Sequence, residues 1–171
     1  MTTLIAVDPG LRGCGVAAGI DKQVTAAAYV ISGADLTDRR AYLWGEMAVA
    51  VRAWALYNGM AGRDECQLVI ELPQVYKASH QRGQKIGTNP QDLIELAAVV
   101  GGITERLNLK TTVYLPAEWK GQVPKSIVHD RARARLSPTE LVVVQKGLPR
   151  ASLAHNVWDA VSLYLRHVGR L

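Results

Sequence analysis

The chain has 171 residues, two cysteines and a formal net charge of +5. This length suits one domain that buries a core without help from metals or disulfides. Neither Cys14 nor Cys66 has a metal-type partner nearby in the sequence, so a zinc site and a disulfide framework are not expected. No apolar run approaches the roughly 20 residues of a membrane span, and the first residues have a strand pattern rather than that of a signal segment. We therefore expect a single domain over residues 1–171, cytoplasmic and without a membrane partner.

Three short strands are predicted at the start of the chain. The first is the apolar run Leu4–Val7, which ends at the turn sequence Asp8-Pro9-Gly10. Residues 13–20 and 24–31 form the next two, joined by a hairpin turn at Asp21-Lys22. A helix is expected after them, over about residues 38–59, because apolar side chains recur there at every fourth position: Leu43, Met47, Val51 and Ala55.

Strands and helices alternate over the rest of the chain. A buried strand is expected at Leu68–Ile70, and Asn89-Pro90 has the form of a helix start, with an Asn cap and Pro in the first turn. Gly101-Gly102 inside that helix costs roughly 1 kcal/mol per residue against Ala, which predicts a close backbone contact there. The remaining elements are a strand at 111–115 and three helices. The first spans 124–136, the second begins at the capping box Ser137–Glu140, and the third spans 153–168.

This order of elements predicts an α/β fold. The first three strands can form an antiparallel meander, and the two later strands arrive through helical crossovers. A mixed five-stranded sheet flanked by helices follows, which is the RNase H-like order.

Two acidic residues stand at the ends of predicted buried strands. Asp8 directly follows Val7, and Glu71 directly follows Ile70. An ionised carboxylate at such a place is costly unless it is paired or binds a cation. A third acid, Asp159, lies on the otherwise apolar side of the last helix. The alternative is that Asp8 belongs to a turn motif and that Asp159 caps or pairs locally.

If the two strands are neighbours, the carboxylates converge and repel one another, and a divalent cation relieves that repulsion. Oxygen-only ligands suit Mg²⁺ or Mn²⁺ rather than zinc. Two such ions per site can activate a water and stabilise the leaving oxygen of a phosphodiester.

His155 and Asn156 precede Asp159 by four and three residues, and both spacings bring a side chain near Asp159 on a helix. Either can supply a metal ligand, orient a water or shuttle a proton. The alternative for His155 is a partly exposed residue near the start of its helix. The expected catalytic residues are thus Asp8, Glu71, Asp159, His155 and Asn156.

Several segments, in order, resemble RuvC-type Holliday junction resolvases. Residues 6–10 and 13–17 resemble the first strand and hairpin of that family, and Val69-Ile70-Glu71 resembles its second acidic strand. Residues 156–161 resemble the helix that bears the last acid. The region between is matched by Pro116, Lys120 and Pro124-Lys125.

The resemblance implies an RNase H-like fold and a metal-dependent homodimer that nicks four-way DNA junctions. It implies that Asp8, Glu71 and Asp159 bind the metal. The family has a fourth acid or a histidine three residues before its last Asp. Here that position is Asn156, with His155 one residue earlier, so the fourth ligand is either of the two. The short, divergent chain would suit a phage-encoded member.

Two basic stretches are predicted to contact DNA. The first follows Glu71, contains no acid, and places phosphate-binding cations and one stacking aromatic at the rim of the site; it comprises Tyr76, Lys77, His80, Arg82 and Lys85. The second includes a stripe at helical spacing beside Val128, Ala132 and Leu136. Its members are Lys120, Lys125, His129, Arg131, Arg133, Arg135, Lys146 and Arg150. The alternative for the first stretch is a solvated loop.

Other function classes remain open. The Asp8-Pro9-Gly10 turn also occurs in actin-like and sugar-kinase ATPases, but those need two such domains, so no nucleotide cofactor is expected. Within the fold, cleavage of RNA–DNA hybrids or other branched DNA is the nearest rival, and an inactive junction-binding protein is another. Two cuts in one junction require two sites and hence a dimer. Its candidate interfaces are the helix with Trp44 and Trp54 and the Gly101-Gly102 helix, unless both only pack on the sheet.

Overall fold

The computed structural model describes residues 1–31, 43–60, 65–74, 79–81, 84–86 and 89–171. Its centre is a five-stranded sheet with the strand order β3-β2-β1-β4-β7. β2 pairs antiparallel with both β1 and β3, while β4 is parallel to β1 and β7 is parallel to β4. The predicted mixed sheet is therefore confirmed. Its strands are β1 (Thr3–Asp8), β2 (Cys14–Ile20), β3 (Gln23–Val30), β4 (Cys66–Glu71) and β7 (Lys110–Tyr114).

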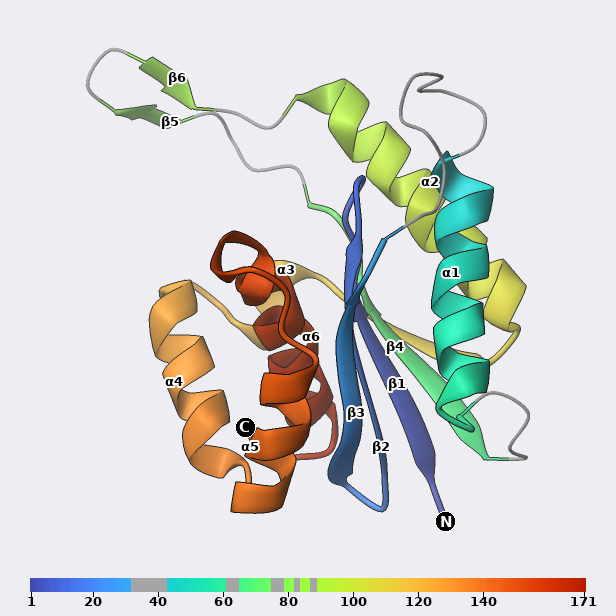
Figure 1. The fold of residues 1–171 in the computed structure, drawn as a ribbon. Helices are drawn as coiled ribbons and strands as arrows, with labels where there is room; N and C mark the ends of the chain where they lie inside the picture. The colour runs from blue at the N-terminus through green and yellow to red at the C-terminus, as the bar shows by residue number, and fades with distance from the viewer. Residues whose placement is uncertain (32–42, 61–64, 75–78, 82–83, 87–88) are drawn as a thin grey trace.

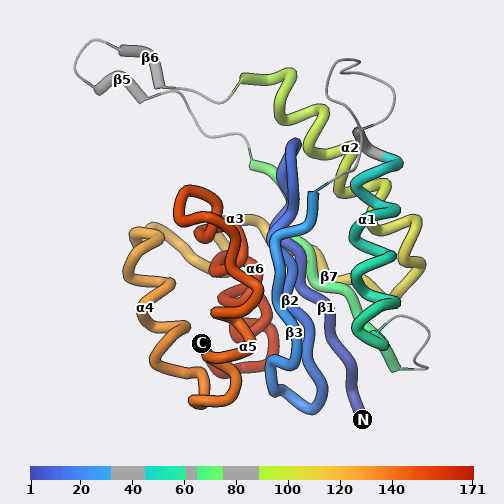
Figure 2. Tube along the Cα trace, viewed as in Figure 1, coloured from blue at the N-terminus to red at the C-terminus, as the bar shows by residue number. Residues whose placement is uncertain are grey.

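Helices cover both faces of the sheet (Figure 1). One face packs against α1 (Leu43–Tyr57) and α2 (Pro90–Leu107), and the other against α5 (Pro138–Lys146) and α6 (Ala154–His167). α4 (Lys125–Arg135) belongs to the second layer and packs on α6. The tube along the chain shows the same two helical layers (Figure 2). Residues 38–42, the start of the predicted first helix, lie outside the described residues.

The sheet separates two apolar cores because alternate residues of a strand point to opposite faces. On β1, Ile5 and Val7 belong to the core under α1 and α2, while Leu4 and Ala6 belong to the core under α6. Asp8 continues the second set. The alternation therefore directs Asp8 to the face that α6 covers.

Local signals in the sequence are confirmed where the chain turns or a helix begins. Asp21 and Lys22 both have positive φ, 48° and 72°, as the tight β2–β3 hairpin requires. The Asn89 side chain accepts a hydrogen bond from the Gln91 amide at 3.1 Å and starts α2. The Ser137 hydroxyl and the Glu140 carboxylate exchange hydrogen bonds with each other's backbone amides at the start of α5.

The close backbone contact predicted at Gly101-Gly102 is not found at Gly101. No atom lies within 4 Å of the point where a Cβ of Gly101 would stand, and the residue is exposed. α2 packs instead through its larger apolar residues, including Val99 and Ile103. The close approaches occur at Gly15 and Gly147, where a Cβ would overlap the backbone of another element.

Three short elements were not predicted. The strands β5 (Ser79–Gln81) and β6 (Gln84–Ile86) pair antiparallel with each other, and α3 (Pro116–Trp119) follows β7. A single 3₁₀ turn, Ala151–Leu153, precedes α6. None of the helices in the described part of the chain has the length and apolar content of a membrane span.

Candidate active site

Two carboxylates stand side by side where neighbouring parallel strands end. Val7 of β1 pairs with Ile70 of β4, so the next residues, Asp8 and Glu71, are neighbours at the last positions of their strands. This confirms the expectation that the two strands are neighbours. The fold thus brings together two acids that are 63 positions apart in the sequence.

A glycine lets the third acid approach. Gly15 of β2 is directly opposite Asp8 in the antiparallel ladder. A Cβ at Gly15 would overlap the backbone carbonyl of Asn156, so the first turn of α6 lies in backbone contact with β2. One turn further along the same helix, Asp159 is only 1% exposed. Gly15 therefore determines how close α6, and with it Asp159, comes to Asp8.

The carboxylates of Glu71 and Asp159 both lie near enough to Asp8 to act on its charge. Burial raises the pKa of Asp8 well above its ordinary value, and the carboxylates of Asp159 and Glu71 raise it further. Lys125 and Lys120 act in the opposite direction but do not cancel these effects. Asp8 makes no side-chain hydrogen bond within the described residues that would stabilise its charge.

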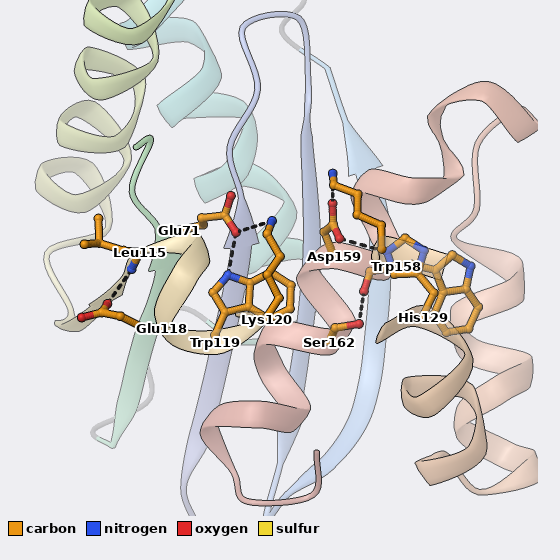
Figure 3. A network of polar contacts seen from close by, with 10 residues as sticks. Glu71, Leu115, Glu118, Trp119, Lys120, His129, Trp158, Asp159 and Ser162 are labelled. Carbon is orange, nitrogen blue, oxygen red and sulfur yellow. Dashed lines mark hydrogen bonds and ion pairs between the residues drawn. The ribbon is translucent and has the colours of Figure 1, made fainter. Parts of the chain in front are cut away.

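Asp159 is held by two basic side chains from α4 (Figure 3). Lys125 Nζ donates to Oδ2 at 2.6 Å, and His129 Nε2 lies 2.9 Å from Oδ1. Burial alone would raise the pKa of Asp159, but the hydrogen bonds from His129 and Lys125 outweigh it, so the pKa is lowered. Asp159 is therefore ionised, whereas Asp8 beside it resists ionisation.

Glu71 is held by two neighbouring residues at the end of α3 (Figure 3). The Trp119 indole Nε1 donates to Oε2 at 2.6 Å, and Lys120 Nζ lies 3.1 Å from the same oxygen. The Lys120 and Glu71 side chains are only 13% and 15% exposed. Trp119 was not among the predicted site residues. The signal that could have identified it is chemical, because a buried indole N–H usually requires an acceptor.

The roles expected of His155 and Asn156 as further ligands or proton carriers stay predictions. His155 is exposed, and neither it nor the Asn156 side chain makes a hydrogen bond to Asp159 within the described residues. Asn156 contributes its backbone contact with Gly15 instead. The histidine that reaches Asp159 is His129, which was predicted only as a DNA contact.

The basic stripe on α4 lies against α6 and is not turned fully to solvent. Val128, Ala132 and Leu136 are buried as predicted, but His129 is buried with them. Arg133 stacks over the Trp158 ring, 4.5 Å from its centroid, and pairs with Asp130 at 2.9 Å. The expectation of a stripe open to phosphates is corrected for His129, while the Lys125 and Arg133 side chains remain about half exposed, at 53% and 49%.

Most of the predicted contacts of the first basic stretch lie outside the described residues. Tyr76, Lys77 and Arg82 lie outside the described residues. His80 and Lys85 pair with each other across β5 and β6. Their expected contacts with DNA stay predictions.

Asp8, Glu71 and Asp159 are the candidate ligands of a metal ion. No three His, Cys, Asp or Glu side chains in the described ranges are grouped closely enough to hold an ion as they stand. The oxygens of Asp159 and one oxygen of Glu71 face N–H groups. The donor chemistry nevertheless fits a hard divalent cation, because three carboxylates converge and the charge of Asp8 has no hydrogen-bonded partner within the described residues.

Comparisons with known proteins agree with the fold. No family model matches the sequence, and no curated protein does. Among solved structures, Thermus thermophilus RuvC superimposes with a TM-score of 0.56 at 16% identity, over 98% of this chain and 93% of that one. The complex of T. thermophilus RuvC with a Holliday junction substrate gives 0.51 at 14% identity over the same shares. The fowlpox virus Holliday junction resolvase gives 0.51 at 12% identity, over 98% of each chain. The chain therefore has the fold of RuvC-type Holliday junction resolvases.

Proposed function

We propose that this chain is a metal-dependent endonuclease that resolves four-way DNA junctions as a homodimer. The observation that carries the proposal is the Asp8 carboxyl group, placed between the carboxylates of Glu71 and Asp159 where β1 and β4 end. A partly buried acid whose pKa is raised by burial and by two like charges has no evident role in stabilising the fold, and such groups cluster at functional sites. The junction-bound structure of a protein with the same fold supports the choice of substrate.

Asp8, Glu71 and Asp159 would hold the divalent cation, Mg²⁺ or Mn²⁺, two ions per site, with Asn156 as the expected further ligand. Bound there, the ions would activate water and stabilise the leaving oxygen of the phosphodiester. His129 fixes the orientation of the Asp159 carboxylate through Oδ1. A hydrogen bond of this kind to a ligand typically supports both the geometry and the affinity of a metal site.

Lys125 and Lys120 are the cations of the site. Hydrogen bonding and charge from Asp159 outweigh burial and raise the pKa of Lys125, so Nζ stays protonated. Because its side chain is 53% exposed, Lys125 can also reach an oxygen of a bound phosphate. Lys120 lies deeper and mainly balances the charge of Glu71.

The homodimer is supported by the outer surface of the α1–α2 layer. α1 packs on the sheet through Met47 and Val51, as the alternative expectation held. Its opposite face exposes Val49, Leu56 and Tyr57, at 47%, 52% and 91%. Both expectations for α1 are thus compatible, with one face in the core and one available to a second copy. Trp54 is partly buried against the core, which leaves the outer residues to form the interface.

The test is a gel assay with a labelled four-way junction, the matching linear duplex and an RNA–DNA hybrid. Wild type and Asp8→Asn are compared in Mg²⁺, Mn²⁺ and EDTA. We expect paired nicks in the junction alone, dependent on metal and lost in Asp8→Asn. Faster cleavage of the hybrid would identify the rival nuclease, and junction binding without cutting in either metal would identify an inactive junction-binding protein.

A further inference from the structure

A row of paired residues connects the acid cluster to β3. Tyr29 of β3 is directly opposite Gly15 of β2, which is directly opposite Asp8 of β1. Directly opposed residues point to the same face of a sheet. Tyr29 therefore faces the same side as Asp8, two strand spacings or about 10 Å away.

The Tyr29 ring is directed toward the end of the sheet where Asp8 lies. The start of α6 covers Gly15, and the ring leans along the strand onto Gly13. A Cβ at Gly13 would stand 2.5 Å from the Tyr29 hydroxyl oxygen and from the ring carbon Cζ. Because Gly13 has no side chain, the Tyr29 hydroxyl has room to lie at the rim of the site.

Two arginines adjoin the residues around Tyr29. Arg12 directly precedes Gly13, on which the Tyr29 ring rests, and Arg150 lies six positions before Asn156, whose carbonyl covers Gly15. The pKa of Tyr29 is raised, first by burial and then by Cys14, while Arg150 and Arg12 oppose the shift and Asp8 adds to it. Arg12 belongs to the β1–β2 connection and Arg150 to the segment before α6, and both are exposed. In the described part of the chain neither guanidinium has a hydrogen-bonded or ion-paired partner, and neither has the Tyr29 hydroxyl.

These three groups share one chemistry. A protonated tyrosine donates one hydrogen bond, and an arginine presents a planar fork of donors that matches phosphate oxygens. Two exposed arginines in the segments that adjoin one neutral donor, with no carboxylate paired to either within the described residues, form a surface that favours an anion. The acid cluster beside them repels a free anion, so the ligand must be anchored by contacts on both sides.

We propose that Tyr29, Arg12 and Arg150 form a binding subsite for a backbone phosphate of the DNA strand, next to the phosphate that is cut. The inference rests on the proposed function for the nature of the ligand. The subsite also gives the path of the DNA strand, which then crosses the end of the sheet from β3 toward β4. Tyr29 and Arg12 are residues that the sequence had not assigned to DNA contact.

The experiment measures binding of a fluorescent four-way junction by anisotropy in EDTA, across a series of salt concentrations. Arg12→Ala and Arg150→Ala are each expected to reduce the slope of log Kd against log salt by about 1, as the loss of one phosphate contact does. Tyr29→Phe keeps the slope and weakens binding about fivefold, the loss of one hydrogen bond. Gly13→Ala, which displaces the hydroxyl, should resemble Tyr29→Phe.

The matched control is Arg106→Ala. Arg106 is an exposed arginine in the last turn of α2, which leads into the start of β7 and so lies at the opposite end of the sheet. It is expected to leave both slope and affinity unchanged. Thermal unfolding of each variant is recorded in parallel, and DNA binding is compared only among variants that unfold at the same temperature as wild type.

The outcomes separate the subsite from the proposed function. If wild type cuts junctions while the arginine variants keep the wild-type slope and Tyr29→Phe keeps the wild-type affinity, the subsite is overturned and the nuclease stands. If wild type binds DNA without cutting and the slopes still fall, the subsite is supported and the nuclease is overturned. A wild-type protein that binds no DNA overturns both.

Discussion

Two carboxylates on the same side of the sheet differ in whether the fold gives them hydrogen-bond partners. Glu140 at the start of α5 accepts hydrogen bonds from the Val24 and Ser137 amides, each at 2.8 Å, and from both Nη atoms of Arg170, at 2.6 and 3.0 Å. Burial would raise its pKa, but the bonds from Arg170 and the backbone bring it down to about 2. Asp8 has no such partners in the described structure, and its pKa is raised by burial and by Asp159 and Glu71.

The difference separates an acid that stabilises the fold from one that is kept for chemistry. At Glu140 the lone pairs are used within the fold, as stability requires of a buried charge. At Asp8 the fold keeps a like-charged cluster that costs free energy and that an added cation would relieve. Changing each acid should therefore affect stability and activity in opposite ways.

The largest expected effect is on cleavage by Asp8→Asn. Removing a ligand from the acid cluster should lower the rate of junction cutting by about a thousandfold or more. In EDTA the same variant should unfold at an equal or higher temperature than wild type, because one of three repelling charges is gone. A variant that unfolds well below wild type would mean that Asp8 stabilises the fold, and the contrast with Glu140 would be lost.

Gly15→Ala should impair the site without touching an acid. The new Cβ overlaps the Asn156 carbonyl and pushes α6 outward, and a displacement of about 1 Å at a catalytic group costs roughly a hundredfold in rate. The measurement is single-turnover cleavage, with Gly101→Ala as the control, since the position of its Cβ is empty to 4 Å. Equal rates for the two variants would show that α6 does not set the approach of Asp159.

Glu140→Gln tests whether Glu140 acts on stability and not on activity. It leaves Arg170 without its anionic partner, so the free energy of unfolding should fall by roughly 3 kcal/mol, as for other broken buried pairs. Urea denaturation at neutral pH measures the loss. Cleavage by the folded variant should remain near wild type, and a large loss of rate would place Glu140 in the functional set.

His129→Leu removes the nitrogen that orients Asp159 and should lower the cleavage rate about tenfold while raising the metal concentration needed for half-maximal activity. His129→Gln retains an N–H donor in a similar place and should recover most of both. A structural role alone would not produce this recovery at equal thermal stability. If both variants cut like wild type, the contact at 2.9 Å has no part in the reaction.

The smallest effect is a difference in acid sensitivity. The pKa of Glu140 is about 2 in the folded chain against an ordinary value of 4.5. A depressed pKa gives stability that is fully present above pH 4.5 and is lost as the pH falls toward 2. Wild type should therefore lose more stability than Glu140→Gln over this range, measured by urea denaturation at a series of pH values. Parallel curves for the two proteins would contradict the assignment.

The parts of the molecule that depend on local sequence were predictable. The β2–β3 hairpin, the Asn89 and Ser137 helix starts and the strand ends at Asp8 and Glu71 each follow from a few adjacent residues. The neighbouring positions of β1 and β4 followed from the order of strands and crossovers. This was enough to bring together two of the three acids.

The contacts between helices were not predictable in the same way. The spacing of His155 and Asn156 from Asp159 identified neighbours on one helix, but the histidine that bonds Asp159 comes from α4, 30 positions earlier. Nothing in the sequence near His129 states against which helix it will pack. The glycines illustrate the same limit, because the sequence singled out Gly101-Gly102 for a close contact, whereas the structure leaves Gly101 open and has a close contact at Gly15.

Arg170 also bears on how the chain reaches its final form during synthesis. Its Nη1 donates to the carbonyl of Lys22 in the β2–β3 turn, 148 positions earlier, as well as to Glu140. The β2–β3 hairpin therefore leaves the ribosome long before the residue that joins its turn to α5. Contacts this distant in sequence form late and slow folding, so the attachment of this hairpin to α5 is completed only after Arg170 has been translated.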